Sequence, residues 1–185
     1  FYECTAEWLL KSSPDLVGFM TEADSYHHLI QILTRVKKLN PNVLTLLGGV
    51  HATAVHYETL RDFPDVDLIV RGEGEIPFTQ LVKALRESRS LSDVPNLTFR
   101  NNGRVQMTLD VPLIDDLDTL PFPDLSHCSL SDEDVVYLEI GRGCPFKCNF
   151  CFTAPYWKRK HRIKSPGRIM SELAYFRDEF GRTDF

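Results

Sequence analysis

Residues 43–53, VLTLLGGVHAT, decide the fold, because five residues that favour a β-strand lead directly into two glycines. The run is apolar nearly throughout rather than alternating, which is typical of a strand buried on both faces of a parallel sheet. Two similar runs lie on either side of it, at residues 15–20 and 66–70. Together the three segments predict a parallel sheet.

Helical patterns follow the first and third of these strands. Apolar residues at helical spacing lie between the first two strands, at Leu29, Ile30, Leu33 and Val36. A second set follows Pro77, at Phe78, Leu81, Val82 and Leu85. Because strands and helices alternate, we expect an α/β fold with right-handed crossovers and an incomplete doubly wound, Rossmann-like sheet.

Small and polar residues follow each predicted strand. In open α/β sheets the ligand binds at the carboxyl ends of the strands, where glycines let it approach the backbone. The candidate ligand-binding residues are Thr21, Gly48, Gly49, Gly72, Glu73 and Gly74.

The alternation of strand and helix patterns ends after residue 88. Residues 96–100 and 104–108 flank Asn101-Asn102-Gly103, which predicts a β-hairpin. The Pro- and Asp-rich residues 110–125 then indicate a linker, or a strap lying across another surface. Residues 135–140 predict a fourth strand, and Ser165-Pro166 predicts the start of a helix.

Composition excludes several classes of function. Of the 185 residues, 43% are apolar and 25% charged, as in a globular protein. A net charge of −5 argues against a general nucleic-acid binder, and no apolar run approaches the roughly 20 residues of a membrane helix. No signal peptide is visible, so we expect a cytoplasmic protein that binds neither nucleic acid nor membrane.

Three of the five cysteines lie close together, with the spacing C-x3-C-x2-C: Cys144, Cys148 and Cys151. An odd, clustered set without secretory features indicates metal ligation rather than disulfides. Three thiolates can hold three irons of a [4Fe–4S] cluster and leave the fourth iron open for an added ligand. For Cys4 and Cys128 we expect no metal.

A zinc site is the alternative for this loop. The three cysteines would then be joined by His127 or His161. Zinc ligands usually come as two close pairs, so the spacing favours the iron–sulfur cluster.

The segment GRGCPFKCNFC, residues 141–151, resembles the cluster motif of radical SAM enzymes, including the aromatic Phe150 before the third cysteine. The resemblance implies a partial (β/α) barrel whose first strand is residues 135–140. It also implies that S-adenosylmethionine binds the open iron, near Phe150, and is cleaved to a 5′-deoxyadenosyl radical.

The order of DLVGFMT, LLGGVHAT, RGEGE, a hairpin, LPFPD and the cysteine motif resembles the B12-binding-domain subclass of radical SAM proteins. The resemblance implies that the glycine loops and Thr21 contact cobalamin. It divides the chain into part of a cobalamin-binding domain (1–88), a linker with a hairpin and a Pro-rich strap (89–134) and the N-terminal part of a radical SAM domain (135–185). The family's first two strands are expected before Asp15, so the sheet should have a gap between neighbouring strands.

The resemblance implies methyl transfer to an unactivated carbon or to phosphorus, with a radical cyclase of the magnesium-protoporphyrin ester type as the alternative. A non-catalytic iron–sulfur or zinc protein stays open. The substrate, a small molecule or a peptide, is not apparent from the sequence.

Two further features have an ordinary and a functional interpretation. His51 is either a plain loop histidine or a contact for a cobalamin side group. The basic residues 158–164 are either a solvated connector or a surface for an anionic substrate or an electron donor such as flavodoxin or ferredoxin.

Overall fold

A computed structural model describes residues 1–128, 131 and 135–185 of the chain. The chain forms two compact units, Phe1–Leu113 and Ile114–Phe185. The end of the predicted linker, at residues 129–130 and 132–134, lies outside the described residues. Within the described part, no helix is both long and apolar enough to cross a membrane.

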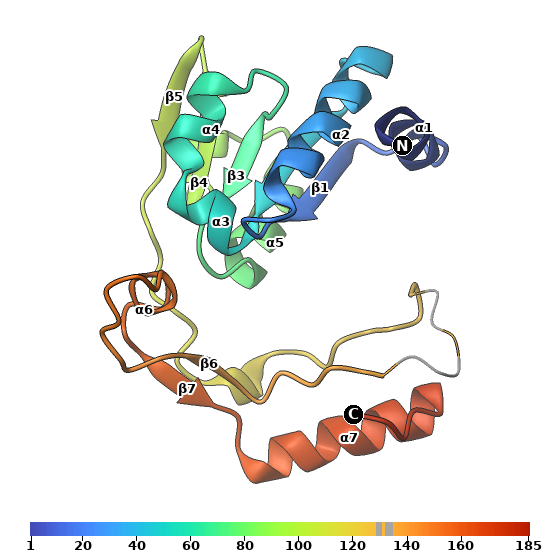
Figure 1. Cartoon of the computed structure of the whole chain (residues 1–185), viewed down its shortest axis with the longest axis vertical. Coiled ribbons are helices and arrows are strands. Elements are labelled where there is room, and N and C mark those ends of the chain that lie inside the picture. The colour runs from blue at the N-terminus through green and yellow to red at the C-terminus, as the bar shows by residue number, and fades with distance from the viewer. Residues whose placement is uncertain (129–130, 132–134) are drawn as a thin grey trace. The chain divides into compact units, whose positions relative to one another are not determined.

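The first unit is built on a five-stranded sheet with the strand order β1-β2-β3-β4-β5 (Figure 1). Three strands are parallel: β1 (Leu16–Met20), β2 (Leu44–Gly48) and β3 (Leu68–Val70). β4 (Leu97–Asn101) pairs antiparallel with β3, and β5 (Arg104–Met107) pairs antiparallel with β4. The predicted α/β fold with a largely parallel sheet is confirmed.

The gap expected between neighbouring strands is wrong. β1 pairs directly with β2 over five residues, from Leu16 opposite Leu44 to Met20 opposite Gly48. The strands β1, β2 and β3 therefore stand in chain order without an interruption, and β1 is the edge of the sheet.

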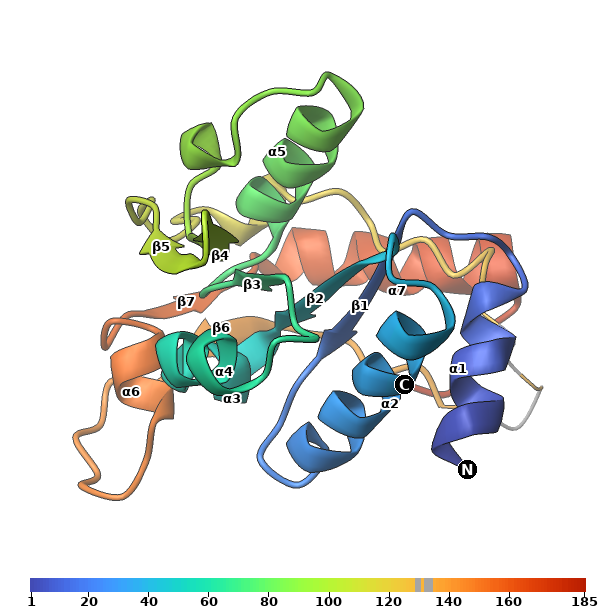
Figure 2. The ribbon, with the colours of Figure 1, turned by 90° about the horizontal axis from the view of Figure 1, so that it is seen from above.

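Helices cover both faces of this sheet (Figure 2). One face carries α1 (Tyr2–Leu10), α2 (Tyr26–Leu39), α3 (Gly49–Ala54) and α4 (His56–Asp62). The other face carries α5 (Glu75–Arg86). The short helices α3 and α4 were not predicted, because neither is long enough to show a helical period.

Alternate residues of each strand pack into two separate hydrophobic cores, one on each face of the sheet. On the face of α1–α4, Val17, Leu47 and Ile69 are buried with residues of α2. On the face of α5, Leu46, Leu68 and Val70 pack with Leu81 and Ala84. Burial on both faces explains why the strands are apolar throughout.

The predicted hairpin is confirmed, and it extends the sheet. Its turn has two consecutive residues with positive φ, Asn102 at 50° and Gly103 at 76°, as a type I′ turn requires. The hairpin is fastened to β3 by Arg71, which is 6% exposed. The Arg71 guanidinium donates to Leu97 O (2.9 Å), Thr98 Oγ1 (2.7 Å) and Thr108 O (2.7 Å).

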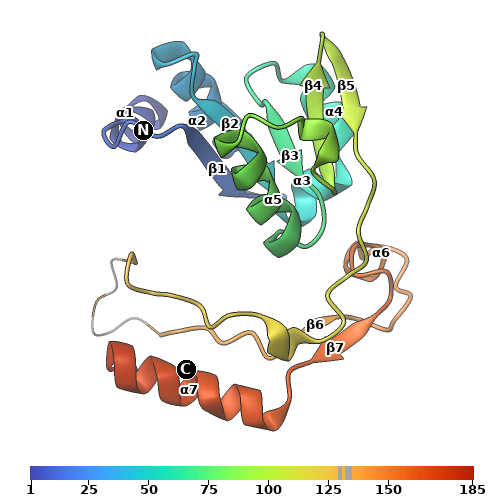
Figure 3. The same ribbon diagram turned by 180° about the vertical axis from the view of Figure 1, so that it is seen from behind.

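The second unit contains a two-stranded antiparallel ribbon and two helices (Figure 3). Its elements in chain order are the 3₁₀ turn η2 (Leu117–Thr119), β6 (Gly141–Gly143), α6 (Thr153–Tyr156), β7 (His161–Ile163) and α7 (Pro166–Phe180). The predicted start of α7 is confirmed: the Ser165 hydroxyl accepts from Arg168 N at 3.1 Å and caps the helix.

The strand predicted at residues 135–140 is wrong. The residues have the right apolar composition, but a strand requires a partner along its length. Val136 N donates to Asp184 O (3.1 Å) and Lys164 N donates to Ile140 O (2.9 Å). Only residues 141–143 form a ladder, with β7, so the described part of this unit has a ribbon where the first barrel strand was expected.

The Pro- and Asp-rich segment lies across another surface, as predicted. It contacts β7 and the start of α7, 45 to 50 residues further along the chain. The contacts are Lys160 Nζ to Asp115 Oδ1 (2.9 Å), Arg162 Nη1 to Ile114 O, Ser165 N to Asp118 Oδ1 (2.9 Å) and Arg168 Nη1 to Asp118 O (3.2 Å). We call residues 114–118 the acidic strap.

A buried carboxylate with two cations lies where β7 leads into α7. Glu172 is fully buried and accepts from Lys164 Nζ at 2.8 and 2.9 Å and from Arg168 Nε at 2.8 Å. Lys164 directly follows β7 and Glu172 lies in α7, so this ion pair ties the end of the strand to the helix, and replacing Glu172 would remove the buried counter-charge of both cations.

Replacing Arg71 should strongly destabilise the first unit. Arg71→Met removes the buried donor to Leu97 O, Thr98 Oγ1 and Thr108 O, of which Leu97 O keeps a bond from Thr108 N, so we expect a loss of about 2–4 kcal/mol in the free energy of unfolding, measured in urea. The control is Asp110→Asn, since Asp110 pairs with Arg71 at 2.7 Å but its side chain is 57% exposed. It should cost at most about 1 kcal/mol. Equal losses in the two variants would contradict this account of the hairpin.

The hydrogen bonds around Arg71 should also make the stability of the first unit depend on pH. Arg71 donates to Thr98 Oγ1, which also forms a hydrogen bond with His56 Nδ1 at 3.0 Å. Burial and the nearby Arg71 lower the pKa of His56. The unfolded chain then binds the proton more readily than the folded one, so stability should fall as the pH drops below the ordinary histidine value of about 6.5.

His56→Gln should reduce this fall, because glutamine cannot titrate. The measurement is the urea midpoint of both proteins between about pH 7.5 and 5.5, around the ordinary histidine pKa. Parallel curves for the two proteins would show that another group controls the pH dependence.

Candidate functional site

The carboxyl ends of β1 and β2 are joined by Thr21. Thr21 is fully buried, and its hydroxyl donates to Gly48 O at 2.8 Å and accepts from Ala52 N at 2.9 Å. Its backbone N–H also donates to Gly48 O, at 2.8 Å. The Thr21 side chain therefore positions the loop after β2, and its hydrogen bonds are made inside the protein.

Gly49 is required by the protein's own packing. Its φ is +89°, and a Cβ at this position would lie 2.8 Å from both Met20 Cγ and Thr21 O. Only glycine fits such a close approach with a positive φ. The sequence analysis predicted that Gly49 contacts a ligand. In the structure, a side chain at Gly49 is excluded by its close packing against Thr21.

The loop after β3 is more open. Gly72 has φ +69°, and its N–H donates to Thr53 Oγ1 at 3.0 Å. Glu73 is 7% exposed. A Cβ on Gly74, by contrast, would meet nothing within 4 Å, and one on Gly48 would meet only Val70 O, at 3.6 Å. Gly48 and Gly74 are thus the predicted glycines beside which a ligand has most room.

Apolar side chains at the same edge are exposed. Met20 ends β1 and is 76% exposed, Val50 follows Gly49 and is 40% exposed, and Ile76 in the first turn of α5 is 39% exposed. The sequence analysis counted Met20 toward a buried strand, because nothing in the sequence distinguishes an exposed apolar residue from a buried one. Together they offer an apolar surface beside the glycine loops.

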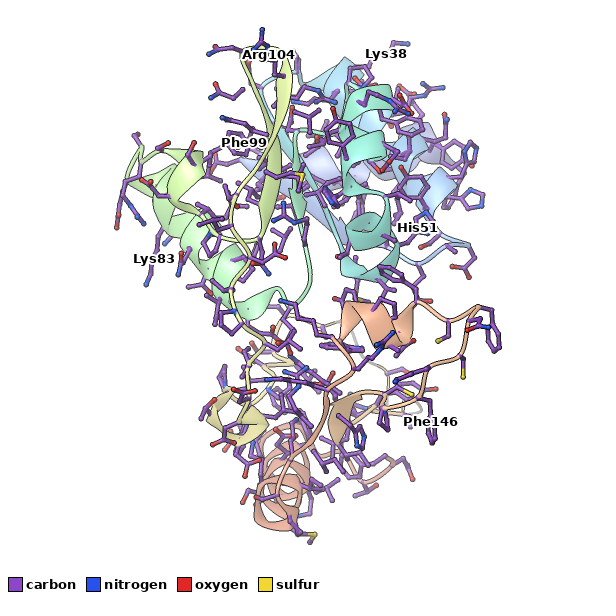
Figure 4. The ribbon with its side chains drawn as sticks, turned by 90° about the vertical axis from the view of Figure 1, so that its left-hand side faces the viewer. Lys38, His51, Lys83, Phe99, Arg104 and Phe146 are labelled. Carbon is purple, nitrogen blue, oxygen red and sulfur yellow. The ribbon has the colours of Figure 1, made fainter. Side chains whose placement is uncertain are left out.

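His51 lies on α3, beside these loops (Figure 4). Its ring is 4.5 Å from that of Tyr26, and its backbone N–H donates to Thr21 O at 3.3 Å. Burial raises the pKa of Tyr26, whose hydroxyl contacts Thr59 Oγ1 at 2.7 Å. His51 is therefore held by contacts within the protein, which supports the ordinary interpretation.

The three clustered cysteines lie on an open loop between β6 and α6. All three are free thiols; Cys148 is exposed, while Cys144 and Cys151 are half-buried. Cys151 N donates to Cys148 O at 3.2 Å. Within the described residues, no group of three or more Cys, His, Asp or Glu side chains is close enough to hold a metal ion, so the three sulfur atoms are not gathered around one point.

Cys151 is prepared to act as a thiolate. Hydrogen bonds from the Thr153 hydroxyl and the Thr153 backbone N–H lower the pKa of the Cys151 thiol. A deprotonated thiol is the form that ligates metals. The aromatic neighbours on the loop are exposed, Phe146 by 69% and Phe150 by 93%, and Figure 4 shows Phe146 standing out from the backbone.

The histidines considered for a zinc site are both exposed. His127 is exposed and His161 lies exposed on β7, opposite Gly143. Neither belongs to a metal-sized group with the cysteines in the part of the chain that is described. The three thiols are likewise apart in the described residues, so the preference for a cubane cluster with one open iron rests on the C-x3-C-x2-C spacing.

Comparison with known proteins agrees with the description of the first unit. A family model for the B12 binding domain matches residues 5–82. An uncharacterized methyltransferase of Pyrococcus horikoshii is 33% identical over 181 residues, which are 95% of this chain and 39% of the relative. The anaerobic magnesium-protoporphyrin IX monomethyl ester cyclase of Rubrivivax gelatinosus is 33% identical over 86% of this chain and 30% of its own length.

Among solved structures, the cobalamin-dependent S-adenosylmethionine radical enzyme OxsB, with aqua-cobalamin bound, has a TM-score of 0.75. The match covers 98% of this chain and 26% of OxsB at 21% sequence identity, so it supports the fold alone. The chain spans between about a quarter and two fifths of the proteins that it resembles.

The B12-binding model covers the three parallel strands of the sheet and its glycine loops. The match to the Pyrococcus horikoshii relative extends over the cysteine loop as well. Residues 5–82 of the chain belong to the B12-binding domain family, and nearly the whole chain is related in sequence to the Pyrococcus horikoshii methyltransferase and the Rubrivivax gelatinosus cyclase.

Proposed function

We propose that this chain is part of a cobalamin-dependent radical SAM enzyme that transfers a methyl group to an unactivated carbon. The observation that carries the proposal is the presence, in one chain, of a B12-binding domain at residues 5–82 and three free thiols with C-x3-C-x2-C spacing at residues 144–151. A methyltransferase relative that matches 95% of the chain favours methyl transfer.

The cysteine loop would hold the cluster. Cys144, Cys148 and Cys151 supply three thiolates, and the hydrogen bonds from Thr153 favour the charged form of Cys151. A [4Fe–4S] cluster with one open iron supplies the electron that cleaves bound S-adenosylmethionine. Phe150, being exposed on the same loop, is available to pack against the S-adenosylmethionine.

The carboxyl edge of the sheet would hold cobalamin. Gly48, Gly72 and Gly74 let the ligand approach the backbone, while Met20 and Ile76 offer exposed apolar surface. Thr21 and Gly49 act indirectly, because they fix the loop after β2.

A radical cyclase is the second candidate. The magnesium-protoporphyrin ester cyclase relative is as similar in sequence, 33% identical, as the methyltransferase relative. The two functions differ in product, because only methyl transfer adds carbon from S-adenosylmethionine. Incubating the full-length protein with methyl-labelled S-adenosylmethionine and candidate substrates separates them: label in the product supports methyl transfer, and an unlabelled ring-closed product supports the cyclase.

Anaerobic reconstitution tests the cluster. The full-length protein should take up about four irons per chain, since that is the content of one cubane. Cys144→Ala, Cys148→Ala and Cys151→Ala should each abolish the cluster absorbance, because each removes one of only three ligands. Cys128→Ala is the control; Cys128 is an exposed free thiol outside the loop and should leave iron content unchanged. One zinc per chain without iron would refute the cluster.

Substitution of Gly74 tests the cobalamin edge. Gly74→Leu fills open space at the predicted loop without a positive φ to strain, so the fold should survive. We expect hydroxocobalamin to bind at least about tenfold more weakly, which corresponds to roughly 1.4 kcal/mol. Gly167→Leu on α7 is the matched control, since a Cβ there meets only Ser165 Oγ, at 3.9 Å.

The cobalamin and cluster proposals can fail separately. Iron content should be the same in Gly74→Leu, Gly167→Leu and the unmodified protein, because the cysteine loop is a different element. Equal hydroxocobalamin affinity in all three proteins, measured by equilibrium dialysis, would place the corrinoid elsewhere.

A further inference from the structure

Asn96 is a buried polar residue at the start of the hairpin, and it was not among the predicted site residues. It directly precedes β4, the strand next to β3 in the sheet (Figure 1). It is 7% exposed, although asparagine is mostly a surface residue. Its φ is 51°, in the left-handed region that asparagine enters more readily than most residues. A polar side chain buried in such a backbone requires hydrogen-bond partners.

Both ends of the Asn96 carboxamide are bonded to the backbone. Its Nδ2 donates to Arg71 O at 3.0 Å, and its Oδ1 accepts from Val111 N at 2.6 Å. The carbonyl of Arg71 can only accept and the N–H of Val111 can only donate, so the two partners fix the orientation of the carboxamide. An ionised aspartate could replace the bond from Val111 N but not the bond to Arg71 O, because it has no hydrogen to donate.

The backbone of Asn96 is bonded at the same place. Arg71 N donates to Asn96 O at 2.8 Å, and Asn96 N donates to Leu109 O at 2.9 Å. Asn96 therefore holds both the N–H and the carbonyl of Arg71, one with its backbone and the other with its side chain. Arg71 directly precedes residues 72–74, the open glycine loop at the carboxyl edge of the sheet.

Gly72 connects this bond to the loop. Its φ is +69°, and a Cβ on it would lie 3.4 Å from Asn96 Nδ2, so the carboxamide packs closely against it. On the other side of the loop, Gly72 N donates to Thr53 Oγ1 of α3 at 3.0 Å. A loop with two glycines has many conformations open to it. One side chain from α3 and one from the hairpin restrict that choice.

We propose that Asn96 is a positioning residue for cobalamin, whose carboxamide holds the loop of residues 72–74 in the conformation that accepts the corrinoid. The inference rests on the proposed function, which assigns this edge of the sheet to cobalamin. Asn96 acts through Arg71 O and needs no contact of its own with the ligand. Without the carboxamide the loop would occupy more conformations, and the apparent affinity would fall with the fraction of loops that are competent to bind.

A role confined to the hairpin is the competing interpretation. Asparagine would then be needed only for its left-handed φ, and glycine, which adopts the same φ freely, would replace it without loss of affinity. The two interpretations differ for Asn96→Gly, because this variant permits the same backbone conformation and removes only the side chain. Asn102 offers a matched position: its φ is 50°, but it is exposed at the tip of the same hairpin.

The test measures the affinity of the full-length protein for hydroxocobalamin by equilibrium dialysis. Asn96→Gly removes both carboxamide bonds, and Asn96→Asp removes the donor to Arg71 O while it keeps an acceptor for Val111 N. We expect affinity to fall roughly 3- to 10-fold in each variant, the change that corresponds to one lost hydrogen bond. Asn102→Gly and Asn102→Asp make the same substitutions at the same φ and should bind as the unmodified protein does.

A destabilised control separates positioning from general stability. Leu33 is fully buried in α2 and packs in the core on that face of the sheet, so Leu33→Ala lowers stability and leaves the bonds of Asn96 in place. Its affinity for hydroxocobalamin should be retained. Amide hydrogen exchange without ligand gives a second, local measurement: Asn96→Gly should speed exchange at residues 71–76 and leave residues 30–36 of α2 unchanged.

The outcomes separate this inference from the proposed function. If the unmodified protein is folded by urea titration and does not bind hydroxocobalamin, the proposed function fails, and the positioning role fails with it. If it binds, and the Asn96 variants bind equally well, the positioning role alone is overturned. An equal loss of affinity in Leu33→Ala, or exchange that speeds up equally in α2, would assign the effect to general stability and would also overturn it.

Discussion

The hydroxyl of Thr21 is the contact on which the ligand edge of the first unit depends. It sits at the end of β1 with no exposure to solvent, and it satisfies a carbonyl of β2 and an amide of α3 at once. A buried polar group left without partners costs about 1–3 kcal/mol, so the loop after β2 has little freedom to move away. Gly49 completes the junction, since its missing side chain lets the backbone pass against Thr21. The glycine loops beside it are thus set by the packing of the sheet.

The cysteine loop is organised differently, being fixed at its ends and open in its middle. Gly143 anchors its start in the ribbon, and hydrogen bonds around Cys151 and Thr153 anchor its end. Between them, residues 145–150 are exposed. A loop of this kind keeps its attachment points while its sulfur atoms remain accessible to incoming iron.

Sequence predicted the buried elements well, because burial on both faces leaves a clear apolar signal in residues 43–47 and 66–70. It failed at residues 135–140, where local composition satisfied the criterion for a strand and the pairing partner, a tertiary property, was missing. The glycines show the same limit. Gly49 and Gly74 cannot be distinguished in the sequence. A Cβ on Gly49 would lie 2.8 Å from Met20 Cγ and Thr21 O, whereas one on Gly74 would meet nothing within 4 Å. The exposure of Met20 and the buried pairing of Lys164 with Glu172 were equally beyond local reasoning, since each depends on tertiary packing.

The acidic strap also has a consequence for the order of events during synthesis. Its partners in β7 and α7 lie 45 to 50 residues downstream, so the strap leaves the ribosome well before anything exists for it to bind. At roughly 5–20 residues per second, the delay is about 2–10 seconds. The cysteine loop emerges within this interval, before the contacts that close the second unit can form. The three thiols therefore leave the ribosome on a still unclosed chain, and closure of the strap follows as a later step.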